Sequence, residues 1–246
     1  AYRSFTDYRG LIIGGVCVAF SLVQLYSTWF IIPSTHMRPL HLAIVLLLAF
    51  LLYPARRKSR KDTLPWYDVA LAVAALAVYL YPVIFFETIA RQISYETYQL
   101  VLGGIGVLLL LEACRRVVGL PIVIIATAFM CIGFFGKYMP GFIGNRGYSL
   151  KNIVKHLFFT QEGIFSTPIG ASSTFIFLFI LFGSFLEKTG VGEFFIDLSN
   201  AVAGHKRGGP AKVAVITSAL EGTVSGSSVA NTVGSGSFTI PMMKRL

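Results

Sequence analysis

This sequence has little charge, few cysteines and few acidic residues. Only 13% of its 246 residues are charged and 55% are hydrophobic, which excludes an ordinary water-soluble domain. The three cysteines, Cys17, Cys114 and Cys131, have no CxxC spacing and lie in or beside apolar runs, so we expect buried thiols rather than disulfides or metal ligands. Lysine and arginine outnumber aspartate and glutamate by 21 to 11. The basic residues lie in short clusters between apolar runs, which indicates membrane topology and not nucleic-acid binding.

The motifs of ATP-driven transport and of catalysis are also missing. Gly204 and Gly209 have the first glycine spacing of a phosphate-binding loop, but Pro210 and Ala211 replace its Lys and Ser or Thr. The four histidines are expected at interfaces or in loops, away from the serine-rich segment where an intramembrane enzyme would need one: His36, His41, His156 and His205. We therefore predict no catalytic residue and no cofactor.

Six apolar windows approach the ~20 residues that cross ~30 Å of hydrocarbon. They cover residues 11–32, 38–54, 66–86, 98–114, 118–138 and 164–186. The first window is too long for a cleaved signal peptide, so it is predicted to be a true span. The prediction is an all-α, polytopic helical membrane protein with about six transmembrane helices, a re-entrant helical hairpin and interfacial amphipathic helices.

The basic clusters predict the orientation. Arg56, Arg57, Lys58, Arg60 and Lys61 lie between the second and third spans, so this loop should be cytoplasmic. The amino terminus is then cytoplasmic too. Residues 137–163 form one discordant outer loop because they hold four basic residues.

Two short segments have the apolar spacing of amphipathic helices. After Ser149, a possible N-cap, the residues Leu150, Ile153, Val154, Leu157 and Phe158 form one apolar stripe, which predicts a helix in the membrane interface. Between Gly192 and Gly204, a second stripe contains Phe194, Phe195, Leu198 and Val202. We interpret that helix as a surface connector, or as a brace between a moving and a fixed element.

Residues 209–241 predict a re-entrant hairpin. Pro210 favours a helix start, and the helix meets a glycine and serine cluster near Ser225 after about 22 Å, which is too short to cross the bilayer. A second arm from about Val229 to Ile240 is closed by Pro241. Broken helices of this kind mark the binding sites of transporters.

The hairpin tip suits a cation and an anion together. Carbonyls at the end of the first arm, with Gly222, Ser225 and Gly226, are candidates for holding sodium. The N–H groups that open the second arm, with Ser227, Ser228 and Asn231, suit a carboxylate. Glu221 is a possible coupling residue.

Other interpretations remain open. Small residues also let membrane helices pack closely, and this is the preferred explanation for Gly103, Gly104 and Gly106. Glu221 could instead pair with Lys212 or Arg245, and Asp68 is read as an interfacial residue. A re-entrant loop can also form the filter of an ion channel. The alternative function is therefore an ion channel, or a secondary transporter of another family with a re-entrant loop.

The run from Gly204 to Arg245, GHKRGGPAKVAVITSALEGTVSGSSVANTVGSGSFTIPMMKR, resembles the large permease subunit of tripartite ATP-independent periplasmic (TRAP) transporters, and the likeness extends over about residues 170–246. It is most similar to the type in which small and large subunits are fused. The resemblance implies sodium-coupled secondary import of a small organic carboxylate by an elevator-type movement, across the cytoplasmic (inner) membrane of a bacterium. Glu221 departs from the apolar or small residue expected there.

The resemblance also implies domains and partners. Residues 1–117 would be a four-span, small-subunit-like domain, and residues 118–246 the start of a large-permease-like transport domain that includes the hairpin 209–241. The implied partners are a periplasmic substrate-binding protein, the organic-acid substrate, the lipid bilayer and the remainder of the large permease domain, which would carry a second hairpin.

Overall fold

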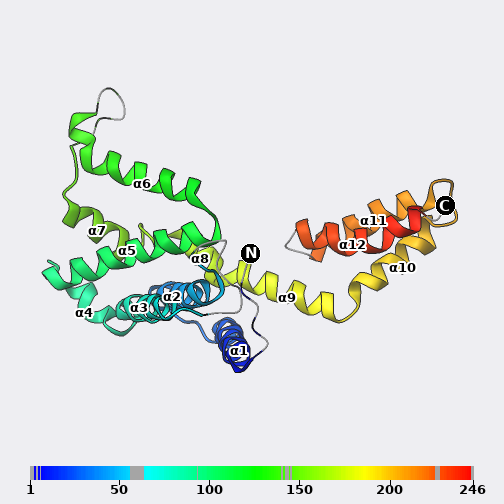
Figure 1. The fold of residues 1–246 in the computed structure, drawn as a ribbon, viewed down its shortest axis with the longest axis horizontal. Coiled ribbons are helices and arrows are strands. Elements are labelled where there is room, and N and C mark those ends of the chain that lie inside the picture. The colour runs from blue at the N-terminus through cyan, green and yellow to red at the C-terminus, as the bar shows by residue number, and fades with distance from the viewer. Residues whose placement is uncertain are drawn as a thin grey trace. The chain divides into compact units, whose positions relative to one another are not determined.

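The computed structural model describes residues 3, 5, 7–55, 64–92, 94–139, 141, 144, 146–224 and 228–244. Every regular element in these residues is helical, as predicted (Figure 1). The chain forms two compact units, residues 1–174 and 175–246. The basic cluster from Arg56 to Lys61 lies outside the described residues.

The first unit contains most of the helices. These are α1 (Tyr8–Trp29), α2 (Ser34–Leu52), α3 (Trp66–Ile84), α4 (Phe86–Arg91), α5 (Thr97–Val117), α6 (Leu120–Phe135), the 3₁₀ turn η1 (Gly136–Tyr138), α7 (Leu150–Phe159) and α8 (Thr167–Ala171). The π-helical segment η3 (Ser172–Ile176) follows, and the second unit holds α9 (Phe177–Lys188), α10 (Val191–Ala203), α11 (Gly209–Val224) and α12 (Ser228–Lys244).

Five helices in the described part of the chain are long and apolar enough to cross a membrane, and they match five predicted spans. They are α1, α2, α3, the segment Leu120–Tyr138 and the segment Thr167–Leu186. The other predicted span corresponds to α5, which has 21 residues but is not among the five. Its last two turns carry Glu112, Arg115 and Arg116. The structure is that of a polytopic helical membrane protein.

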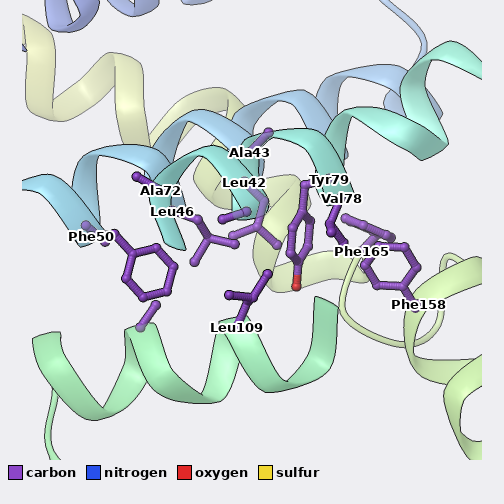
Figure 2. Close-up of a cluster of buried hydrophobic side chains, with 13 residues drawn as sticks. Leu42, Ala43, Leu46, Phe50, Ala72, Val78, Tyr79, Leu109, Phe158 and Phe165 are labelled. Atoms are coloured by element: carbon purple, nitrogen blue, oxygen red, sulfur yellow. The ribbon is translucent and has the colours of Figure 1, made fainter. Parts of the chain in front are cut away.

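The core of the first unit lies where α2, α3 and α5 meet (Figure 2). Alanines on α3, such as Ala72 and Ala75, leave room for Leu46 and Phe50 of α2. Tyr79 is fully buried, and its hydroxyl donates a hydrogen bond to the carbonyl of Gly106 on α5, at 2.9 Å. This bond satisfies a polar group that would be costly to leave unpaired in an apolar core.

Helix α7 has the predicted N-cap, since Ser149 Oγ accepts a hydrogen bond from the backbone of Asn152. Its apolar face packs on the glycines of α5. A Cβ on Gly103 would lie 2.9 Å from Val154, and a Cβ on Gly106 would overlap the ring of Phe158. The packing role predicted for these two glycines is therefore confirmed, whereas nothing lies within 4 Å of a Cβ at Gly104.

We expect Gly106→Val to lower the thermal stability of the detergent-solubilised protein, because the new methyl groups would collide with the buried Phe158 ring. Overpacking of this kind costs about 1–3 kcal/mol. Gly104→Val is the matched control, with the same residue change two positions away in open space. Equal unfolding temperatures for the two variants would contradict close packing of α7 on α5.

Buried ion pairs join one end of α3 to one end of α5. Asp68, in the first turn of α3, binds Arg3 at 2.5 Å and Arg116 at 2.7 Å, and all three side chains are at most 2% exposed. Glu112 binds Arg116 and Arg115, each at 2.7 Å. Two arginines enclose the Asp68 carboxylate, so it belongs to a buried ion-pair network. Its position at the membrane interface stays a prediction.

The arginines of this network also cap α2. Arg3 donates to the carbonyl of Leu51 at 3.1 Å, and Arg116 donates to the carbonyl of Tyr53 at 3.3 Å. These are among the carbonyls that have no partner within a helix at its carboxyl end. The network thus joins residue 3 to the ends of three helices.

The predicted span 164–186 is interrupted. Thr174 has φ −127° and ψ −106°, which is not helical, and it lies inside the π-helical segment η3. The two compact units divide directly after this residue. Short π-helical segments inside longer helices are frequent at functional sites.

Candidate functional site

Helices α11 and α12 form the predicted hairpin. They pack against each other side by side and run in opposite directions (Figure 1). With 16 and 17 residues, they rise only about 24 and 26 Å, less than the ~30 Å of a hydrocarbon core. The second arm is longer than predicted, because α12 continues through Pro241 to Lys244.

Helices α10 and α11 pack against each other, and their buried positions include small and polar residues as well as the branched apolar Ile196 and Val213. Val213 and Thr217 are buried on α11, and Ile196, Ser199 and Ala203 are buried on α10. This packing is typical of membrane helices, which approach through small side chains. The apolar stripe predicted on α10 is not its buried face. Phe194, Leu198 and Val202 are 59%, 41% and 54% exposed.

Two contacts define the register of these helices. At one end, the α-carbon of Gly209 lies so close to the carbonyl of Gly204 that a Cβ would overlap it. Gly208, just before, has φ +72°, so both glycines are required to close this turn. At the other end, Glu221 Oε1 lies 3.8 Å from the position that a Cβ on Gly192 would occupy.

The structure describes only part of the predicted tip. Ser225, Gly226 and Ser227 lie outside the described residues. Gly222, in the last turn of α11, and Ser228, the first residue of α12, are both exposed. Asn231 belongs to the first turn of α12, and its side chain is outside the description.

Glu221 lies on the face of α11 that meets the first turn of α10. Lys212 precedes it by nine residues in the same helix, which places the two on opposite faces and ~13 Å apart along the axis. The suggested pair between Glu221 and Lys212 is therefore not formed, and Arg245, the other suggested partner, lies outside the described residues. A carboxylate beside the first turn of a helix is stabilised by the helix dipole.

Two residues near the tip were not singled out from the sequence. Gly183 of α9 faces the end of α11, since a Cβ there would lie 2.9 Å from the carbonyl oxygen of Val224. Thr217 is fully buried one turn before Glu221, and among the described residues its hydroxyl has no hydrogen-bond partner. A glycine or threonine in an apolar run gives no sequence signal of this kind.

A histidine does lie beside a serine, although far along the chain from the hairpin. His41 is only 3% exposed. Its Nε2 lies 3.1 Å from Ser172 Oγ, and its Nδ1 lies 2.6 Å from Gln24 Nε2. These hydrogen bonds connect α1, α2 and η3 in the first unit, so we interpret the cluster as a structural tie between helices.

The cysteines differ in their exposure. The three cysteines are free, but Cys131 is exposed on α6 rather than buried. Within the described residues, no group of three or more His, Cys, Asp or Glu side chains could hold a metal ion.

Comparison with known proteins gives a family match over more than half of the chain. The model of the tripartite ATP-independent periplasmic transporter, DctM component, matches residues 105–246. A putative TRAP transporter large permease protein of Haemophilus influenzae is 39% identical over 66 residues, which are 27% of this chain and 16% of that protein.

Two further relatives have a substrate in their names. The C4-dicarboxylate TRAP transporter large permease protein DctM of Rhodobacter capsulatus is 45% identical over 65 residues, 26% of this chain and 15% of the relative. The protein of the same name in Pseudomonas aeruginosa is 43% identical over 67 residues, which are 27% of this chain and 16% of the relative. The chain thus aligns with about a sixth of these relatives' length. No solved structure matches it.

Proposed function

This chain belongs to the DctM component family of tripartite ATP-independent periplasmic transporters, and from that premise we propose that it is part of a sodium-coupled secondary importer of a small organic carboxylate. Membership of this family makes it a multi-pass membrane transport protein rather than an enzyme, and does not favour an ion channel. The observation that carries the proposal is the pair of helices α11 and α12, each too short to cross a bilayer.

The proposed site is the tip of this hairpin. The carboxyl end of α11 carries partial negative charge and the amino end of α12 partial positive charge. Carbonyls near Gly222, with Ser225 and Gly226, would hold sodium, while Ser227, Ser228 and Asn231 would hold the carboxylate. Glu221, one turn from the tip, would influence coupling. Since two relatives are named for C4-dicarboxylates, these are the first substrates to test.

The transport cycle we propose is an elevator-type movement fed by a periplasmic substrate-binding protein. The division into units at Thr174, inside a non-helical break, supports a moving and a fixed part joined at that residue. We further propose that residues 1–117 act as a fused small subunit and that the amino terminus is cytoplasmic. The family match begins at residue 105, inside α5.

The experiment is uptake into proteoliposomes containing the complete transporter, with its binding protein added outside. Organic acids, with C4-dicarboxylates first, should accumulate when an inward sodium gradient is imposed, and uptake should saturate. Accumulation that does not depend on the sodium gradient would contradict sodium coupling. Steady single-channel current in a bilayer would indicate an ion channel instead of an importer.

Alanine substitutions at the tip separate the two ligands. Ser225→Ala should raise the sodium concentration needed for half-maximal uptake about tenfold. Ser228→Ala or Asn231→Ala should chiefly weaken the binding of the substrate. Both effects are expected because a hydrogen bond to a charged group contributes about 1.5–3 kcal/mol. Gly226→Leu should abolish uptake without preventing insertion, because its bulk keeps the backbone away from the ligand. Ser184→Ala is the control, since this serine on α9 is exposed and its hydroxyl donates to the carbonyl of Ile180 in its own helix. Normal uptake kinetics in all the tip variants would indicate that the hairpin only packs helices together and does not bind the ligands.

A further inference from the structure

A groove lies between the end of α10 and the first two turns of α11. Its walls are Val202, Ala203, Lys206, Ala211, Lys212, Val215 and Ile216. Five of these residues are apolar and two are lysines. The groove is open, with Val202 54% and Val215 71% exposed. It lies at the opposite end of α11 from the hairpin tip, so the proposed transport site does not use it.

Charge and apolar surface are ordered along this groove. Lys206 lies in the connection between the helices and Lys212 in the first turn of α11, whereas Val215 and Ile216 follow Lys212 by about one turn, or ~5 Å. His205 and Arg207 add exposed basic groups to the same connection, and no acidic side chain lines the groove. One end of the groove is therefore cationic, and the surface towards the tip is apolar.

This order matches an anionic amphiphile. A small soluble anion would bind the two lysines but would leave the apolar wall uncovered. An apolar peptide segment would use the wall but would bury two lysine charges without partners, which is costly. A phospholipid with a net negative headgroup satisfies both ends, and basic pockets beside membrane helices bind such headgroups.

We propose that this groove binds an anionic phospholipid, with its phosphate between Lys206 and Lys212 and an acyl chain along Val202, Val215 and Ile216. The lipid would hold the amino-terminal end of α11 at the level of the headgroups. The inference rests on that part of the proposed function in which the hairpin enters the bilayer from its basic connection. It does not require that the tip binds sodium or substrate.

Native mass spectrometry of the complete, detergent-purified transporter tests the proposal, with phosphatidylglycerol or phosphatidylcholine added. Phosphatidylglycerol should be retained more strongly. The double variant Lys206→Ser, Lys212→Ser should lower its affinity about thirtyfold, because each lysine near an anionic headgroup contributes about fivefold. Ala211→Phe keeps both lysines but fills the exposed apolar wall, and should also weaken binding.

The matched control removes two lysines elsewhere. Lys188 and Lys244 are exposed in the last turns of α9 and α12, outside the groove, so Lys188→Ser with Lys244→Ser makes the same charge change. Near-normal phosphatidylglycerol binding in this control supports the groove, and an equal loss would overturn it. Displacement by millimolar inorganic phosphate, together with normal binding in Ala211→Phe, would reduce it to a simple anion site. All variants are compared after their monodispersity and unfolding temperature are checked, and lipid retention is scored independently of uptake.

Discussion

Replacing Asp68 with asparagine should destabilise the first unit by about 3–5 kcal/mol, because the change keeps the shape of the side chain but leaves a buried arginine without its counter-charge. Arg116 would still bind Glu112 at 2.7 Å, whereas the partners left to Arg3 among the described residues would be the carbonyls of α2. Both arginines are at most 2% exposed, so water cannot solvate their charges once the carboxylate charge is removed. For a domain of this size, the unfolding midpoint should fall by roughly 10 °C.

An exposed ion pair provides the control for this prediction. Glu87 and Arg91 are one turn apart on α4, with side chains 84% and 82% exposed. Glu87→Gln should therefore change the midpoint very little, since surface pairs contribute about 0–1 kcal/mol.

A double variant tests the physical reason. Adding Arg3→Met to Asp68→Asn removes the uncompensated charge, so part of the stability should return. If the double variant is no more stable than Asp68→Asn alone, the loss has another cause than the unpaired arginine.

The helices and the hairpin were predictable because they depend on local properties of the chain. Length and apolarity gave the spans, and the density of glycine and serine between Gly222 and Ser237 gave the break between α11 and α12. The N-cap at Ser149 also follows a local rule, in which a serine oxygen accepts from the amide three residues later.

The partners of buried charges were not predictable, because pairing across the chain has no local signature. Arg3 and Asp68 are 65 residues apart, and Asp68 and Arg116 are 48 apart. In the sequence Arg116 looks the same as any topology-setting arginine at the end of a span. Only the fold shows that it is enclosed while its neighbour Arg115 is 37% exposed.

One error came from applying a rule of soluble proteins in a membrane. Pro241 was expected to end the second arm, yet it lies inside α12, as Pro39 and Pro82 lie inside α2 and α3. Prolines are tolerated in membrane helices because neighbouring groups satisfy the freed carbonyl. The apolar stripe of α10 is exposed, which suits a lipid-facing surface.

Gly183→Val should reduce uptake by at least tenfold and raise the sodium concentration needed for half-maximal uptake. A Cβ at residue 183 would lie 2.9 Å from the Val224 carbonyl oxygen, closer than ordinary contact, so either α9 or the last turn of α11 must move. Val224 is the final residue of α11, and its carbonyl is one of those left without a partner inside the helix. A displacement there would change the arm that we propose holds sodium.

The neighbouring position separates this effect from a general change in α9. Ser184 is exposed, so Ser184→Val adds the same side chain one residue later without meeting α11, and uptake should stay near normal. Gly183→Ala should have a smaller effect than valine on uptake, although alanine favours the helix over glycine by about 1 kcal/mol. Stability and transport would then change in opposite directions. If Gly183→Val transports normally with unchanged sodium dependence, the contact between α9 and the end of α11 has no part in coupling.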